Sequence, residues 1–454
     1  MVIEQQNHIH FRVVSFRDVR FWDYYNLTKQ GEFSSKFPII TLNKVLRQRK
    51  EFISITDAEE YKRCRVQLYG NGVVLRDIVN GREIKTKKQQ RCKTDDFLVA
   101  EIDAKFGGYG LVPSNLSGAI VSSHYFLYEI DGGKLLPEYL ALVVKFKNFS
   151  KQVKPTGSTN YAAIRPYDVL GYKIPLAPLS KQKDLVDAYH KQFQLAEKQE
   201  KEAIHLEDWI ESRICKLLGI KIEQSEIKKG LNIFAYKEIT KWSVDFILKQ
   251  GGLSSLKKSI FPVIPLGQII DYLQYGISEK SNVASEGTVV LRMNNIQNRK
   301  INLEKLKHYE FGASKLNKEK VLLQKGDLLF NRTNSKELVG KTAVFDFDGE
   351  YTFASYLIRL RFNKETNPHY VNFVLNSRIG RLQIDLMSRQ ILGQANINSE
   401  ELREILLPIP SLQIQNKIVG ELNKLVNAQE ELLQNAEQNK SLAMKKFEQS
   451  IFIN

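Results

Sequence analysis

The sequence IPLAPLSKQKDLVDAYHKQF (Ile174–Phe193) has a counterpart 233 residues further along, LPIPSLQIQNKIVGELNKLV (Leu407–Val426). In both copies a proline-containing start leads into a stretch whose apolar residues recur every three or four positions. That spacing is typical of an amphipathic helix. Each stretch therefore predicts one long helix, and the distance between them predicts that the chain is internally duplicated.

The apolar positions of the two helices form seams with heptad-like spacing. The first seam consists of Val186, Tyr189, Phe193, Ala196, Ala203, Ile210, Ile214 and Leu217. The second consists of Val419, Leu422, Val426, Leu433, Ala436, Ala443 and Phe447, and a shift of 233 residues brings the two seams together. Neither helix has enough apolar surface alone, so we expect an antiparallel, coiled-coil-like pair. The alternative is that each helix packs only on its own domain.

Short motifs also recur in the same order ahead of each helix. The pairs are Trp22 with Trp242, 36–46 with 259–270, 73–76 with 289–292 (both Val-Val-Leu-Arg), 96–99 with 327–330, 118–130 with 351–362, and 137–140 with 368–371. One match could arise by chance, but an ordered series indicates two copies of one domain. Short apolar and β-branched runs bounded by Gly, Asn and Asp predict mixed α/β domains with twisted sheets.

The expected fold class is therefore α/β (α+β), with two pseudo-repeated domains joined by the two long helices. The first domain is expected at 1–174 and the first long helix at 175–220. A linker and the second domain are expected at 221–407, and the second long helix at 408–454.

Composition restricts the function. The chain has 67 Lys and Arg against 51 Asp and Glu, a formal net charge of +16. That surplus favours a polyanionic partner, because clustered cations release counterions from phosphates. The three cysteines have no paired spacing and the seven histidines no metal-ligand spacing, so we expect neither disulfides nor a metal. Without a signal peptide or an apolar run of about 20 residues, we expect a cytoplasmic protein with no membrane contact.

Motifs for enzyme chemistry are weak or absent. There is no GxxxxGK[ST] phosphate loop, and the glycine cluster at 106–110 lacks the GxGxxG spacing of a cofactor loop. Asn-Pro-His-Tyr at 367–370 approaches the Asn-Pro-Pro-Tyr of amino-methyltransferases, but His replaces the second Pro. Asp96, Asp103 and Lys105 could mimic a metal nuclease, yet the second copy has no matching set. We therefore expect no catalytic residues and no cofactor.

In combination, these features resemble the specificity subunits of type I restriction-modification systems. The stretches that carry the resemblance are GSTNYAAIRPYDVLGYKIPLAPLSKQ (157–182), KGDLLFNRTNSKELVGKTAVF (325–345) and LGQANINSEELREILLPIPSLQIQ (392–415). The resemblance implies a non-catalytic subunit with two target recognition domains. Each domain would read one half of an asymmetric, bipartite site on double-stranded DNA, and the helices would set the gap.

The same resemblance implies partners. Two modification (methyltransferase) subunits and the ATP-dependent restriction subunits would dock on this scaffold and supply all the chemistry. An alternative is a free-standing, duplicated DNA-binding adaptor or regulator. An enzyme with a disguised site is a third possibility, against which the missing cofactor motifs count.

Polar loops are the candidate DNA contacts, because Arg, Lys, Asn and Gln read base edges while Lys, Arg and small hydroxyls bind phosphates. In the first copy these candidates are Lys85, Lys87, Lys88, Gln89, Arg91, Ser158, Thr159, Asn160 and Tyr161. In the second copy they are Arg292, Asn294, Asn331, Arg332, Thr333, Asn334, Lys341, Gln394 and Asn396. Charge runs are more often solvated faces. Arg332 leads the set, because it is expected in a polar loop directly after a strand at 328–330.

Overall fold

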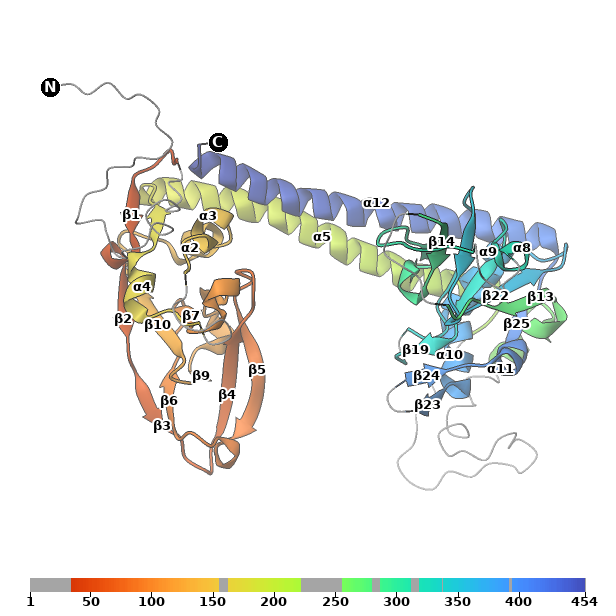
Figure 1. The fold of residues 1–454 in the computed structure, drawn as a ribbon, viewed down its shortest axis with the longest axis horizontal. Helices are drawn as coiled ribbons and strands as arrows, with labels where there is room; N and C mark the ends of the chain where they lie inside the picture. Colours follow the sequence, from red (N-terminus) through yellow and green to blue (C-terminus); the bar gives the residue numbers. More distant parts are fainter. Residues whose placement is uncertain are drawn as a thin grey trace. The chain divides into compact units, whose positions relative to one another are not determined.

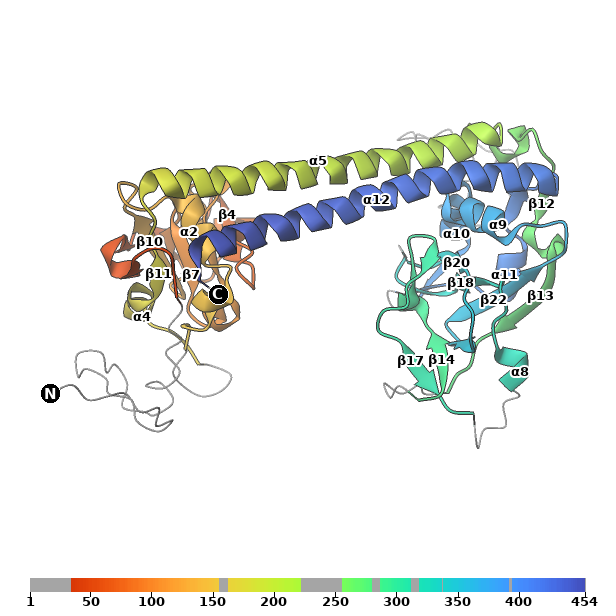
Figure 2. The same ribbon diagram turned by 90° about the horizontal axis from the view of Figure 1, so that it is seen from above.

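The computed structural model describes residues 34–154, 162–221, 255–279, 286–311, 318–336, 338–391 and 394–453. Trp22 and Trp242, one of the repeated pairs, lie outside these ranges. The chain divides into two compact units (Figures 1 and 2): unit 1 consists of 1–198 and 435–454, and unit 2 of 199–434.

Unit 1 is built on a four-stranded antiparallel sheet in the order β2-β10-β7-β8. Its strands are β2 (Leu46–Arg49), β10 (Tyr125–Ile130), β7 (Phe97–Ala100) and β8 (Tyr109–Leu111). A five-stranded sheet, β3-β6-β9-β4-β5, contains Phe52–Ser54, Lys88–Arg91, Ile120–Val121, Glu60–Val66 and Val73–Asn80. The remaining elements are the pair β1 (Ile39–Thr41) and β11 (Lys173–Pro175) and the short helices α2 (Pro137–Val143), α3 (Lys147–Ser150) and α4 (Pro166–Gly171). Every residue of β7 is buried, as its apolar run predicts.

Unit 2 repeats this plan with the sheet β13-β22-β18-β20. Its strands are β13 (Ile270–Tyr275), β22 (Leu357–Phe362), β18 (Leu328–Asn331) and β20 (Thr342–Val344), and the pair β12 (Val263–Pro265) and β25 (Leu406–Pro408) matches β1 and β11. The smaller sheets are β17-β14-β21 (Lys307–Tyr309, Thr288–Leu291, Tyr351–Phe353), β15-β16 (Ile296–Gln297, Lys300–Ile301) and β19-β24-β23 (Thr333–Asn334, Gln394–Asn396, Arg389–Ile391). The helices are α8 (Lys318–Val321), α9 (Pro368–Asn376), α10 (Arg378–Met387) and α11 (Ser399–Arg403). The shared strand order confirms the predicted pair of α/β domains.

The two long helices are α5 (Leu179–Leu217) and α12 (Leu412–Ile451). In unit 1, the start of α5 packs on the end of α12, where the rings of Tyr189 and Phe447 are 6.3 Å apart. In unit 2, Gln429 of α12 donates to the Ala203 carbonyl of α5 at 3.0 Å. The helices are therefore antiparallel, as predicted. None of the helices in the described ranges carries a run that is long and apolar enough to cross a membrane.

Two predictions about individual residues were wrong. Leu433, a predicted seam residue, is exposed. The two Val-Val-Leu-Arg stretches also do not correspond: 73–76 lies in the edge strand β5, whereas 289–291 lies in the central strand β14. β14 pairs in parallel with β21 and antiparallel with β17, and β4 has the same relations to β9 and β5. The counterpart of β14 is therefore β4, and the four identical letters reflect only a shared preference for strands.

The glutamine that opens each long helix is a buried polar anchor. In unit 1, the Gln182 amide donates to the Ala177 and Lys134 carbonyls at 2.8 Å each. In unit 2, the Gln415 amide donates to the Pro410 and Glu365 carbonyls at 2.9 and 3.1 Å. Each side-chain oxygen also accepts a backbone N–H, from the residue before the proline that starts α2 or α9. The recurring Q of the sequence motif thus joins the helix to its domain.

We expect Gln415→Ala to lower the free energy of unfolding by about 2 kcal/mol, because it removes the partner of three backbone groups, the buried Pro410 carbonyl and the part-buried Glu365 carbonyl and Asn367 N–H. Thermal or denaturant unfolding of the full chain measures this effect. Gln413→Ala is the matched control, since Gln413 is exposed on the same helical turn. Equal unfolding midpoints for the two variants would contradict the anchoring role.

Candidate nucleic-acid interface

The leading candidate, Arg332, is held between strands rather than in a loop. It connects β18 to β19, its N–H donates to the Tyr356 carbonyl at 3.0 Å, and its carbonyl accepts the Ile397 N–H at 2.9 Å. The expectation of a loop is therefore wrong, because the polar residues after Phe330 continue the strand and then begin another. The guanidinium lies over the Tyr275 ring, 4.9 Å from its centre. A cation in this position is attracted to the ring face, which restricts where the guanidinium can lie.

Two separate parts of the sequence meet beside Arg332. β19 pairs antiparallel with β24, with Thr333 opposite Asn396, and the Thr333 hydroxyl donates to the Asn396 amide oxygen at 3.0 Å. Asn334 stands opposite Ala395 in the same ladder. Gln394 begins β24. The structure thus brings together two runs of candidates that are about sixty residues apart in the sequence.

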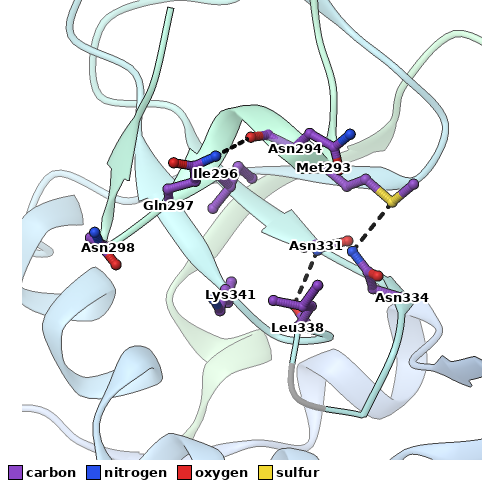
Figure 3. A pocket seen from close by; sticks show the side chains of 9 residues that line it. All are labelled: Met293, Asn294, Ile296, Gln297, Asn298, Asn331, Asn334, Leu338 and Lys341. Carbon is purple, nitrogen blue, oxygen red and sulfur yellow. Dashed lines mark hydrogen bonds between the residues drawn. The ribbon is translucent and has the colours of Figure 1, made fainter. Parts of the chain in front are cut away.

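A pocket of about 340 Å³ opens next to this ladder (Figure 3). Its lining residues are Met293, Asn294, Ile296, Gln297, Asn298, Asn331, Asn334, Leu338 and Lys341. They come from two segments, one following β14 and one that begins with the last residue of β18, and five of the nine carry a side-chain amide. Amides and a lysine present donors and acceptors of the type that contact base edges.

Within the pocket, Asn331 has a mainly structural position. It is 1% exposed, and its amide donates to the Leu338 carbonyl at 3.1 Å, which holds the loop after β19. Burial takes Asn331 out of direct reach of a duplex. Asn334 and Lys341 are half-buried and Asn294 is exposed, so these three remain accessible candidates.

The polar run from Arg292 to Lys300 divides into two parts. Arg292 is half-buried and donates to the Lys305 carbonyl at 2.7 Å. Arg299, by contrast, forms an ion pair with Glu207 of α5, and Lys300 pairs with Glu430 of α12 at 2.6 Å. These last two cations bind the domain of unit 2 to its helices, although the sequence placed them in the same polar run as the DNA candidates.

In unit 1, the candidate basic run covers the loop before β6 and β6 itself. Lys85, Lys88 and Arg91 are exposed, and Lys88 lies over the exposed Phe52 ring. Lys87 pairs with Asp57 at 2.5 Å. Gln89 is buried and donates to the Thr86 carbonyl at 2.6 Å, which takes its side chain out of reach of DNA.

Four further candidates of unit 1, Ser158, Thr159, Asn160 and Tyr161, lie outside the described residues. Their counterparts by motif are the residues around Gln394 and Asn396 in unit 2.

Three residues of the catalytic look-alikes, Asp96, Asn367 and Tyr370, have structural partners. Asp96 forms an ion pair with Arg49, and its counterpart Asp327 pairs with Arg361 at 2.8 Å, so both carboxylates are used inside their own sheets. Asn367 caps α9 by accepting two backbone N–H groups, and the Tyr370 hydroxyl donates to the Pro408 carbonyl at 2.6 Å. Burial raises the pKa of Tyr370 well above its usual range, which keeps that donor protonated.

Sequence reasoning missed Tyr275, whose ring positions Arg332, and the apolar part of the pocket, Met293, Ile296 and Leu338. Nothing in the local sequence links Tyr275 to Arg332, because they are brought together by the pairing of β13 with β22 and of β22 with β18.

Comparison with known proteins finds similarities over part of this chain. A family model described as the type I restriction modification DNA specificity domain matches residues 261–440, which contain the whole pocket. The putative type I restriction enzyme MjaX specificity subunit of Methanocaldococcus jannaschii is 27% identical over 196 residues, 41% of this chain and 45% of that protein. The type I restriction enzyme EcoKI specificity subunit of Escherichia coli is 27% identical over 170 residues, 37% and 36% of the two proteins. Both alignments span less than half of the relative.

The fold also has a counterpart among solved structures. A chain from a study of complex assembly and conformational transition of the type I R-M system superposes with a TM-score of 0.55 at 16% identity. The match covers 91% of this chain and 98% of that one. At this identity the match shows the fold alone.

Proposed function

We propose that this chain, which belongs with the type I restriction-modification specificity subunits, reads an asymmetric DNA site in two parts, one with each unit. The observation that carries the proposal is the position of the polar ladder. Arg332, Thr333, Asn334 and Asn396 come together inside the region that matches the DNA specificity domain. Arginine and amide side chains at such a surface suit base edges in a groove, and the net charge of +16 suits the phosphates.

Differences between the units support an asymmetric site. The sheets β2-β10-β7-β8 and β13-β22-β18-β20 share their strand order, yet the side chains at corresponding ends differ. Asn331 ends β18 where Ala100 ends β7, and Lys341 precedes β20 where Gly108 precedes β8. A common frame with different side chains suits two different base sequences.

The long helices support a scaffolding role. Ile204 and Trp209 of α5 are exposed in unit 2, and Leu195 of α5 and Leu442 of α12 are exposed in unit 1. These exposed apolar side chains leave helix surface that partner proteins could cover. We propose that two modification subunits dock there, that restriction subunits join them, and that these partners, acting with this chain in the cytoplasm, supply all the chemistry.

The domain boundaries at 174, 220 and 407 remain part of the proposal. The free-standing adaptor or regulator remains the alternative, and it predicts a chain that is monodisperse without partners. Size-exclusion chromatography with light scattering, on the chain alone and with modification subunits, separates the two ideas.

We expect the purified chain alone neither to methylate nor to cut DNA, even with S-adenosylmethionine, ATP and magnesium. Addition of the modification subunits should produce methylation at a two-part site, mapped by sequencing of methylated DNA. Methyl transfer by the isolated chain would overturn the non-catalytic assignment.

A further inference from the structure

The backbone site of Arg332 has a counterpart in unit 1, and it is occupied by an acidic residue. Glu101 follows β7 as Arg332 follows β18. The Glu101 N–H donates to the His124 carbonyl at 2.9 Å, as that of Arg332 donates to Tyr356. The Glu101 carbonyl accepts the Ile164 N–H at 3.0 Å, just as the Arg332 carbonyl accepts the Ile397 N–H. The two positions are therefore equivalent, although their charges are opposite.

The Glu101 carboxylate joins two exposed cationic or protonatable groups. Its Oε2 is 2.7 Å from His124 Nδ1, and its Oε1 is 3.3 Å from Arg165 Nη1. The Glu101 side chain is 17% exposed, whereas those of His124 and Arg165 are 73% and 58% exposed. The carboxylate is thus at the base of the cluster, and the two nitrogen-bearing groups are toward solvent.

Stability does not account for such a cluster, because ion pairs at this exposure contribute little to folding. Arg165 uses one of its five N–H donors for Glu101, and His124 keeps Nε2 for another partner. Arg165 balances the charge of Glu101. The remaining N–H donors of Arg165 and the free Nε2 of His124 therefore suit an external acceptor with negative charge density.

We propose that Arg165 and His124 hold in unit 1 the DNA-contacting place that Arg332 holds in unit 2, and that Glu101 is a positioning residue that orients both. This inference rests on the proposed DNA-reading function. The ligand is a pair of acceptor oxygens or nitrogens on DNA, either phosphate oxygens or the O6 and N7 of a guanine. Sequence reasoning could not find the cluster, since its members come from the ends of three elements, β7, β10 and α4.

The test uses the full chain assembled with modification subunits and three duplexes: the mapped site and versions changed in one part or in the other. Arg165→Ala should weaken binding to the mapped site about ten-fold. If Arg165 contacts a guanine, discrimination should relax in only one part of the site, and not the part affected by Arg332→Ala. If it contacts a phosphate, affinity should fall equally for all three duplexes. The slope of log affinity against log salt concentration should then become shallower by about one.

Arg165→Lys distinguishes the two sources further, because lysine keeps the charge but not the planar fork. It should restore binding at a phosphate and fail to do so at a guanine. Arg47→Ala is the control for general loss of positive charge, since Arg47 is exposed in β2 outside the candidate surfaces. It should bind DNA as the unchanged chain does, and the unfolding midpoints of all variants should agree. Unchanged affinity and discrimination in Arg165→Ala, with a discriminating wild-type complex, would overturn the inference. A wild-type complex that does not discriminate among the duplexes would instead overturn the proposed function.

The positioning role of Glu101 has its own readout. Glu101→Ala alone should weaken DNA binding. The double variant Glu101→Ala/Arg165→Ala should bind DNA at least as tightly as the double variant Arg165→Ala/His124→Ala. The reason is that removing Glu101 can cost no more than the two contacts that it orients. Losses that add fully across Glu101 and Arg165 would show that Glu101 acts independently of them, which contradicts the positioning role.

Discussion

Arg332→Ala is expected to weaken binding to the mapped site by roughly 1–3 kcal/mol, with lost discrimination in only one of its two parts. The reason is geometric. The guanidinium is stacked on Tyr275 and the backbone on both sides is hydrogen-bonded, so little side-chain entropy remains to be lost on binding. A pre-oriented guanidinium can form a bidentate contact with guanine. Competition binding with duplexes changed in each part measures both the affinity and the discrimination.

Two variants separate this contact from its alternatives. Arg332→Lys keeps the charge but loses the stacked plane, so it should behave like Arg332→Ala if the contact is bidentate. Tyr275→Leu keeps Arg332 but removes the platform, and we expect an intermediate loss. A uniform loss across all duplexes would make Arg332 a phosphate contact. Unchanged binding in Arg332→Ala would show that the residue does not touch DNA.

Periodic features of the sequence predicted the fold well. Val186 and Tyr189 of the first seam and Val419 and Leu422 of the second are buried as expected, because heptad-like spacing places them on one helix face. The recurring Gln182 and Gln415 could be matched by letter alone, and both proved to be buried anchors. The resemblance to specificity subunits is also confirmed, since the DNA specificity domain model matches residues 261–440 and two specificity subunits align with part of the chain.

The candidate site was less predictable, because its geometry depends on pairing between distant strands. Arg299 lies in the same polar stretch as the candidates Arg292 and Asn294, yet the fold turns it toward Glu207 of α5. Polarity also favoured Gln89, which the fold buries. The pairing of Thr333 with Asn396 arises from the β19–β24 ladder, which no short-range pattern encodes. Charge and residue type therefore nominate candidates, but strand register decides which of them share a surface.

The long helices offer the second large effect, because each contributes seam residues to both units. In α5, Tyr189 is buried in unit 1 and Ala203 is buried in unit 2. In α12, Phe447 is buried in unit 1 and Val426 is buried in unit 2. Lengthening α5 alone near Glu200 would leave the facing part of α12 at its old length, so one of the two seams would lose its register. A lengthened pair needs matched insertions, one near Glu200 and one near Gln434.

We expect four residues inserted at both places to lengthen the unread gap of the DNA site by one or two base pairs and to leave both read parts unchanged. Four residues add about 6 Å along the helix and turn it about 400°, so each seam keeps nearly the same face. One base step is roughly 3.4 Å. Two-residue insertions at the same places are the matched control: they turn the seams about 200°, to the opposite face, and should abolish methylation. Sequencing of methylated sites in cells that carry each variant measures the gap. An active four-residue variant with the original gap would contradict the role of the helices as a ruler, and so would a change in either read part.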